Sequence, residues 1–234
     1  MLNIKPTHHK ISDTVRRIIL VLVFVIVASV VIGYAGGYRL NFNNFSIEAT
    51  GAISLSGSDT ALTVKLNDRT VGASLPVYLN DLKPNQSYSI SVQKDGYTKW
   101  SRTVTVLPNM VANFGPILLF RLEQAPIAST TADVTSWCKS NTPFGKQLVI
   151  DNSDIRIQKD FVTRVSAPVV NACWFNDGFH IAYATADEIH VIDNDGYNDV
   201  TVVTATTPIQ QMGVNTKDSE IDYFDGTNWY KLNI

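Results

Sequence analysis

The chain has 234 residues, of which 45% are hydrophobic and 17% charged, and its formal net charge at pH 7 is −2. Val, Thr, Ile, Ser, Asn and Tyr are abundant while Glu is scarce, a composition typical of β-strands. Residues 40–126 carry seven basic and six acidic side chains, whereas residues 127–234 carry seven basic and fourteen acidic ones. Because this acidic excess would repel a polyanion, the composition excludes nucleic acid as a partner.

Residues 18–35 form an apolar stretch without any charged or amide side chain. As a helix it would be roughly 27 Å long, close to the thickness of a hydrocarbon core. Four basic residues and one acidic residue precede it, which predicts a cytoplasmic amino terminus and an extracytoplasmic remainder. A cleaved signal peptide is the alternative, since small residues follow Tyr34, but the apolar run is longer than the roughly 7 to 15 residues typical of that role.

The sequence predicts a mainly β protein with one amino-terminal transmembrane helix, a small antiparallel β-sandwich and a partial β-propeller-like domain. A stretch rich in Pro, Ala, Ser and Thr marks the boundary between the two β domains. We expect six segments: a cytoplasmic tail at 1–16, a transmembrane helix at 17–36, a juxtamembrane segment at 37–47, the sandwich at 48–122, a linker at 123–132 and the distal β domain at 133–234.

Apolar and polar side chains alternate at 62–67 and again at 88–93, the period of half-buried strands. Short turns are predicted at 67–69 and 83–86, and Asp95-Gly96 supplies the positive φ that a tight reversal requires. Residues 112–120 predict a closing strand. Short strands with a turn about every 8 to 12 residues are typical of an antiparallel sandwich.

Five short runs in this segment resemble the PEGA domain, although Ser58-Asp59-Thr60-Ala61 stands in place of the tetrapeptide that names the family. The runs are 61–67, 75–76, 82–84, 88–92 and 94–97. The resemblance covers about residues 48–120. It implies a β-sandwich associated with surface layers and envelope scaffolds rather than with chemistry. Together with the preceding helix, the chain resembles anchored PEGA proteins of candidate phyla radiation bacteria.

The distal region repeats a pattern in which Trp137 and then Trp174 each precede a strand that begins with an acidic residue. The string 174–196 is similar to a blade of TolB-like or WD-type propellers, and a third partial blade is expected at 221–232. Because a blade takes about 40 to 50 residues, this region holds two or three blades, fewer than the four that close a ring. It is therefore either an open stack capped by the sandwich or a partner, or a sandwich with blade-like hairpins.

Cys138 and Cys173 each adjoin a Trp, and two alternatives are open for them: a disulfide in an oxidising exterior compartment, or two buried free thiols. His180 and His190 are predicted to lie on strand surfaces, and no Cys or His stands at zinc spacing. The acidic run 193–199 places oxygen ligands at alternate positions but lacks the glycine position of a calcium loop, and so predicts a hairpin turn.

Tyr97 and Trp100 are the candidate binding surface, because exposed aromatic rings often contact sugars or peptides; the alternative for Trp100 is the hydrophobic core. No catalytic motif, metal site or cofactor site is found in the sequence, so we expect no enzyme and no cofactor. The expected function is that of a single-pass, membrane-anchored envelope protein whose exterior domains bind proteins, cell wall or surface layer. The alternatives are an extracytoplasmic sensor or accessory subunit and, third, a carbohydrate-active enzyme.

Overall fold

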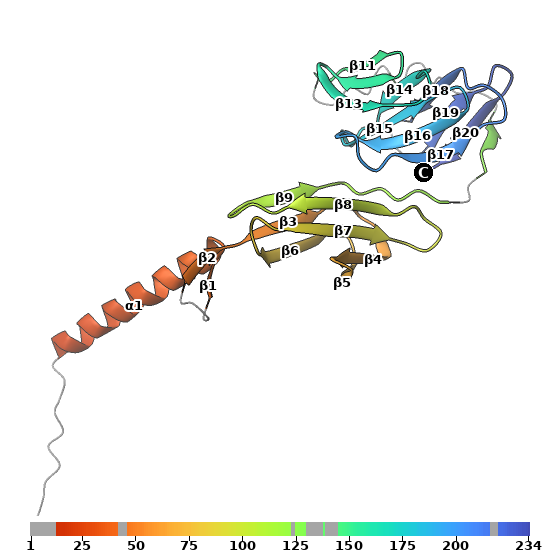
Figure 1. Cartoon of the computed structure of the whole chain (residues 1–234). Coiled ribbons are helices and arrows are strands. Elements are labelled where there is room, and N and C mark those ends of the chain that lie inside the picture. Colours follow the sequence, from red (N-terminus) through yellow and green to blue (C-terminus); the bar gives the residue numbers. More distant parts are fainter. Residues whose placement is uncertain (1–12, 42–45, 123–124, 130–137, 139–144, 216–219) are drawn as a thin grey trace, which may run out of the picture. The chain divides into compact units, whose positions relative to one another are not determined.

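The computed structural model describes residues 13–41, 46–122, 125–129, 138, 145–215 and 220–234 (Figure 1). Residues 1–12 of the expected tail, half of the expected linker (123, 124 and 130–132) and Trp137 lie outside the described residues, so those predictions stay untested. The described chain is mainly β with one amino-terminal apolar helix and several antiparallel sheets, which confirms the predicted fold class. It divides into two compact units, and the division passes through four strands of the expected sandwich, β3, β6, β8 and β9. One unit comprises 1–53, 79–86 and 105–112, and the other 54–78, 87–104 and 113–234.

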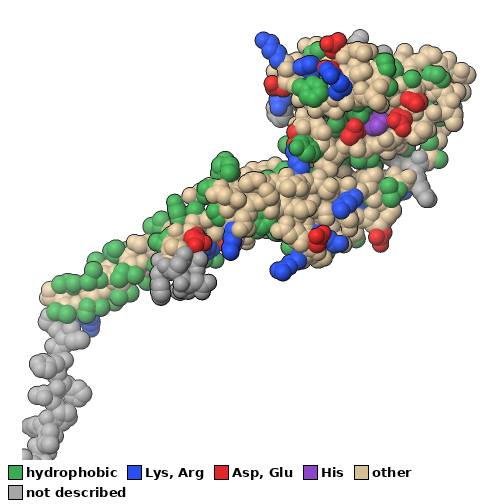
Figure 2. Space-filling model, viewed as in Figure 1, with side chains coloured by type: hydrophobic (Ala, Val, Ile, Leu, Met, Phe, Trp, Pro, Cys, Tyr) green, Lys and Arg blue, Asp and Glu red, His purple; other side chains and the backbone are tan. Residues whose placement is uncertain are grey.

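Helix α1 spans Asp13–Ala35 and is apolar on every side. Its most apolar 18-residue window has a mean hydropathy of 3.0, and none of that window is buried in the protein. Figure 2 shows apolar side chains along the visible face of this helix. By its length and composition, α1 is long and apolar enough to cross a membrane. After it come the paired strands β1 (Tyr38–Asn41) and β2 (Ser46–Ala49).

The expected sandwich contains two antiparallel sheets with strand orders β6-β3-β9 and β5-β4-β7-β8. Buried apolar side chains alternate along β4 and β7, as the predicted period of two requires, and Ser91 of β7 is buried as well. The β4–β5 turn places Asn67 and Asp68 at positive φ, and Gly96 also has positive φ, which confirms the predicted reversals. The bounds are β3 Gly51–Leu55, β4 Thr60–Leu66, β5 Arg69–Ser74, β6 Val77–Leu82, β7 Ser87–Gln93, β8 Trp100–Thr105 and β9 Val111–Phe114.

The closing strand is shorter than predicted, because β9 ends at Phe114, just before Gly115-Pro116. Pro116 has no N–H to give to a ladder, and Gly115 takes positive φ. The chain after this break still packs inside. Phe120 is buried in the same hydrophobic cluster as residues of the distal sheets, so the segment that follows β9 contributes to the distal core.

The distal region folds into three antiparallel sheets, with orders β11-β12-β13, β14-β15-β16-β17 and β10-β20-β19-β18. In the last sheet β10 comes from before the region and pairs with the final strand, β20. The bounds are β10 Ile127–Ser129, β11 Leu148–Asp151, β12 Asp154–Ile157, β13 Asp160–Arg164, β14 Asn171–Trp174, β15 His180–Ala184, β16 Glu188–Asp193, β17 Val200–Thr204, β18 Gln211–Val214, β19 Glu220–Phe224 and β20 Trp229–Asn233.

The β14–β17 sheet lies between the other two. Each of its two faces belongs to a different hydrophobic cluster. Cys173 and Ala182 pack with Met212 of β18 and Ile221 of β19. On the other face, a second cluster joins four residues of this sheet to Ile155 of β12 and its neighbours; the four are Trp174, Ile181, Tyr183 and Ile192. Antiparallel sheets of three or four strands resemble the blades of a propeller. No closed ring of such sheets is seen among the described residues, so the blade interpretation stays a prediction.

Two glycines in comparable turns test this packing. Gly196 and Gly96 both have positive φ, but a Cβ on Gly196 would collide with the Val162 carbonyl oxygen of β13, whereas a Cβ on Gly96 meets open space. We expect Gly96→Ala to lower the free energy of unfolding by about 1 kcal/mol, through backbone strain alone. Gly196→Ala should cost about 3 kcal/mol, since overpacking adds to the strain. Denaturant unfolding of the detergent-solubilised chain measures both, and equal losses would show that the turn after β16 does not press on β13.

Candidate functional site

Tyr97 and Trp100, the two residues of the expected binding surface, have different surroundings. Tyr97 is half-buried; its hydroxyl accepts a hydrogen bond from Arg121 Nε at 3.1 Å, and Lys94 Nζ lies 4.5 Å from its ring centroid. Trp100 begins β8 and is only 5% exposed. Its ring therefore has no open face for a ligand, and the core alternative describes its position. Of the pair, Tyr97 alone remains as a partly accessible ring.

The polar edge of Trp100 joins β8 to the loop between β16 and β17. Trp100 Nε1 donates to Asp193 Oδ2 at 3.3 Å, and Asn198 Nδ2 donates to the same oxygen at 2.8 Å. The backbone N–H of Ser101 donates to Asn198 Oδ1 at 3.1 Å. Burial raises the pKa of Asp193, although these donors act in the opposite direction. The acidic run 193–199 thus uses its side chains to hold β8.

Arg102 makes the strongest contact between the same two segments. Its guanidinium pairs with both carboxylate oxygens of Asp195 and lies 3.7 Å from the ring centroid of Tyr197. The Arg102 side chain is only 12% exposed. Bidentate pairing and stacking on an aromatic ring both depend on the planar guanidinium, so lysine could not reproduce this contact.

His180 lies behind this loop, between two carboxylates. Its Nδ1 is 2.5 Å from Asp177 Oδ2, and its Nε2 is 3.5 Å from Asp193 Oδ1. The prediction that His180 lies on a strand surface is wrong, since the residue is 3% exposed. Every residue of β15 is buried because the sheet is covered on both faces, and strand alternation alone does not reveal such double coverage.

A cavity of about 110 Å³ lies beside His180, between the β8 and β9 side and the turns of the β14–β17 sheet. Its walls include Trp100, Phe114, Phe179, His180 and Asn194. Ligand pockets for whole small molecules usually measure about 300 to 1,000 Å³, so this cavity suits a single small group or a few waters. No Ser, Thr, Cys or Lys is among the lining residues that the structure describes, so His180 has no such nucleophile beside it there.

His190 forms a second carboxylate-bound cluster on the same sheet. Its Nδ1 lies 3.0 Å from Asp199 Oδ1 and its Nε2 lies 3.1 Å from Glu188 Oε2. Tyr183 donates to the other oxygen of Asp199 at 2.6 Å and stacks on the His190 ring at 4.8 Å. Burial acts to lower the pKa of His190, but the two carboxylates outweigh it and the pKa is raised. Burial and the Asp199 bond raise the pKa of Tyr183.

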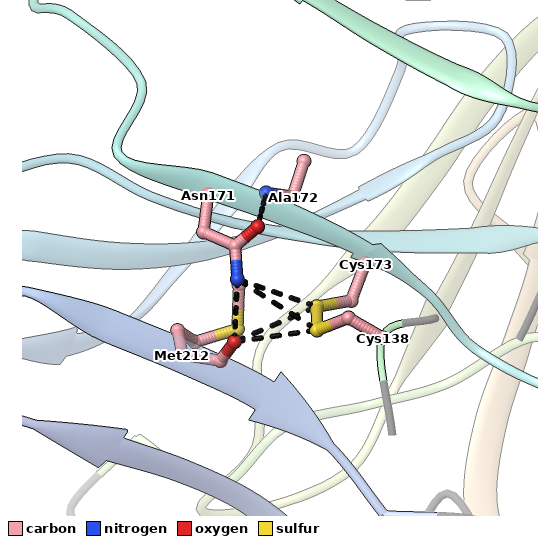
Figure 3. Close-up of a disulfide and its surroundings, with 5 residues drawn as sticks. All are labelled: Cys138, Asn171, Ala172, Cys173 and Met212. Atoms are coloured by element: carbon pink, nitrogen blue, oxygen red, sulfur yellow. Dashed lines mark hydrogen bonds between the residues drawn. A yellow bond between two sulfur atoms is a disulfide. The ribbon is translucent and has the colours of Figure 1, made fainter. Parts of the chain in front are cut away.

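Cys138 and Cys173 form a disulfide against β18 (Figure 3). Asn171 Nδ2 donates to the Met212 carbonyl oxygen at 2.7 Å, and the same oxygen lies 3.3 Å from Cys138 Sγ. Because a disulfide sulfur carries no proton, this second approach is a contact rather than a hydrogen bond. The disulfide joins two residues that are 35 positions apart in the sequence. Cys173 lies in β14 and belongs to the principal distal core.

No metal-binding group is evident where the structure describes the chain: no three His, Cys, Asp or Glu side chains among those residues are placed to hold an ion. The carboxylates of the 193–199 loop contact Trp100, Arg102 and the histidines instead. The sequence signal for this contact was the density of acidic side chains in a loop of an exterior domain. Nothing in the sequence indicated that β8, more than 90 residues earlier, would receive them.

The β8 contact can be measured through Arg102. We expect Arg102→Ala to lower the free energy of unfolding by about 1 to 2 kcal/mol, because the variant loses a sheltered ion pair and a cation–π contact. The control is Lys99→Ala, an exposed cation just before the same strand, which should change stability by no more than about 0.5 kcal/mol. If both variants matched the unchanged chain, the loop would not be held by Arg102.

The His190 cluster should make stability depend on pH. A histidine whose pKa is raised on folding binds its proton more tightly when folded, so its stabilisation is complete below about pH 6.5 and is lost as pH rises through the raised pKa. Between about pH 6.5 and 8, the free energy of unfolding should therefore fall, and His190→Gln should flatten this decline. Glu188→Gln, which keeps Asp199, should flatten it in part. An unchanged slope in His190→Gln would assign the effect to other groups.

The comparisons with known proteins address the proximal β segment. Residues 50–116 match the family model of the PEGA domain, within the segment whose motifs resembled that family. No curated protein matches the chain. Strands β3 to β9 all lie within this match. They include β8, which carries Trp100 and Arg102. Residues 50–116 are thus similar to the PEGA domain, and they follow the apolar helix and precede the three distal sheets in the sequence.

Proposed function

We infer that the protein is a single-pass, membrane-anchored envelope protein whose exterior β domains act as a scaffold or binding module. One observation carries this proposal: α1 is 23 residues long, and none of its residues is buried in the protein. Placing that apolar surface in water would be costly, at about 25 cal/mol for each Å². A bilayer core removes it from water, and at 1.5 Å per residue the helix is long enough to span one.

Two further observations support an exterior location for the β domains. Arg16 and Arg17 lie at the amino-terminal end of α1, the side that positive charge keeps in the cytoplasm. The Cys138–Cys173 disulfide needs an oxidising compartment to persist, and such bonds are rare in the cytosol. The same direction suits the PEGA domain, whose relatives are associated with surfaces and envelopes.

The exterior part suits binding rather than chemistry. β8 is held to the β16–β17 loop by hydrogen bonds and an ion pair, so the acidic side chains of this loop serve as structural contacts. The cavity at His180 is too small to enclose a substrate of ordinary size. Exposed aromatic side chains of the β domains, such as Tyr78, Phe161 and Tyr197, are of the types enriched where proteins meet partners. Envelope proteins, cell wall or a surface layer are the proposed contacts.

Membrane attachment and topology can be tested in the same cells. We expect the full-length chain to stay in membranes washed with alkaline carbonate, and the exterior domains to be digested by protease added to cells stripped of outer layers. Cys138 and Cys173 should resist alkylation in intact cells until a reductant is added, because both sulfurs are bonded. A chain found in the soluble fraction, or cysteines that react without reduction, would contradict the proposed anchor and exterior location.

The binding role needs a separate measurement. Detergent-solubilised full chain should co-sediment with purified cell-wall sacculi or with isolated surface-layer sheets. Substituting the exposed aromatic Tyr78 by Ala, with Lys99→Ala as the matched surface control, tests whether aromatic contacts contribute. An accessory subunit would instead co-purify with a membrane complex and leave the sacculi unbound.

A further inference from the structure

The β1–β2 hairpin, which follows α1 directly, has one apolar face. Leu40 lies directly opposite Ile47 in the ladder, and Tyr38 lies opposite Ala49. Side chains of directly opposed residues share a face, so these four form one apolar surface. Leu40 is 51% exposed and Ile47 is 71% exposed. The other face carries Arg39 opposite Glu48, so the polarity of the hairpin alternates cleanly between its two faces.

This apolar surface and the last turns of α1 enclose a groove of about 510 Å³. Val30, Gly33 and Tyr34 form the helix side of the groove, and Leu40 and Ile47 form the hairpin side. A Cβ on Gly33 would meet nothing within 4 Å, so the groove is open at that point. Figure 1 shows both strands beside the carboxyl-terminal end of the helix.

The position of the groove along α1 indicates whether water or lipid surrounds it. Ser29 lies six residues before the end of α1 at Ala35, which is roughly 9 Å along the helix. If α1 crosses the bilayer, this part of the helix lies beneath the surface of the outer leaflet. Ser29 Oγ donates to the Val25 carbonyl oxygen at 2.8 Å, so its hydroxyl needs no water there. The groove walls therefore suit hydrocarbon.

Polar contacts hold the hairpin beside the end of the helix. Arg39 donates to the carbonyl oxygens of Tyr34 at 2.8 Å and Tyr38 at 3.0 Å, and its guanidinium lies 3.7 Å from the Tyr34 ring centroid. Arg39 also pairs with Asp81 of β6. At the base of the hairpin, the N–H and the hydroxyl of Thr50 both donate to the Gly37 carbonyl oxygen at 2.8 Å. The groove is thus preformed, with a cation at headgroup level.

We propose that this groove binds an acyl chain of a phospholipid in the outer leaflet, and that Leu40 and Ile47 lie in the bilayer rather than in water. This inference rests on the proposed membrane anchor. The occupant is a lipid because the groove adjoins lipid-facing positions of α1 and the hydroxyl of Ser29 in its lining is bonded within the helix. Arg39 at its mouth matches the phosphate of a headgroup.

Depth-dependent fluorescence quenching tests this directly. The full chain carrying Ile47→Cys is labelled with an NBD fluorophore and placed in phosphatidylcholine vesicles that contain lipid spin-labelled at the 5 or 12 position. The disulfide leaves Cys138 and Cys173 unlabelled. We expect blue-shifted emission and loss of fluorescence with the 5-position lipid. Leu40→Cys, on the facing strand, gives a second variant should Ile47→Cys not fold.

Two controls separate the proposals. Glu48→Cys lies on the polar face of the same hairpin, and its label should keep the emission of water. Val30→Cys lies within α1, and its label should be quenched if the helix is in the bilayer at all. Quenching at Val30 without quenching at Leu40 and Ile47 would overturn the lipid groove and leave the anchor standing. No quenching at Val30 would reject the anchor itself. Blue-shifted but unquenched labels at Leu40 and Ile47 would show that a second copy covers the groove, and would also overturn the proposal.

Discussion

The β14–β17 sheet is covered on both faces, and the distal region depends on this double burial. A strand presents alternate side chains to opposite faces, so a sheet between two others must be apolar on both. β15 meets this requirement, with Ile181 and Tyr183 on one face and Ala182 and Ala184 on the other. Each fully buried large apolar side chain contributes about 1.5 to 3 kcal/mol. The two clusters together therefore supply most of the stability that orders the neighbouring sheets.

Polar groups inside such a stack must find partners, and most of them do so through carboxylates. His180 lies between Asp177 and Asp193, and Asp154 accepts two bonds from Arg164, at 2.6 and 2.9 Å. Asp222 differs from these, because among the described residues its Oδ1 has no hydrogen-bond partner. Burial raises the pKa of Asp222 to about 6, so the folded state favours the proton and the charged form lowers stability above that pH.

The apolar helix α1 carries the location proposed for the other features. Among the described residues no side chain of α1 is buried, and the hairpin that follows it continues the apolar surface on one face only. In the proposed arrangement, the helix anchors the chain and the hairpin lies in the outer leaflet. Within the larger compact unit, hydrogen bonds and an ion pair join β8 to the β16–β17 loop. Each level is held by a different interaction, from hydrocarbon burial to ion pairing.

Features that depend on interactions between residues close in the sequence could be predicted from the sequence. An apolar run fixes a helix through composition alone, and Asn67-Asp68 or Asp95-Gly96 fix a turn because few residues tolerate positive φ. The period of two gave β4 and β7. All of these depend on neighbours within a few residues.

Only the tertiary structure decided which faces are covered and which loop meets which strand. Strand alternation placed His180 at a surface, yet a second sheet buries it. From its sequence Trp100 could be a ligand platform, although a Trp at the start of a strand is more often part of the core, and its partner Asp193 lies 93 residues away in the chain. Burial and long-range pairing depend on how sheets stack, and a one-dimensional pattern carries no record of what lies on the far side of a sheet.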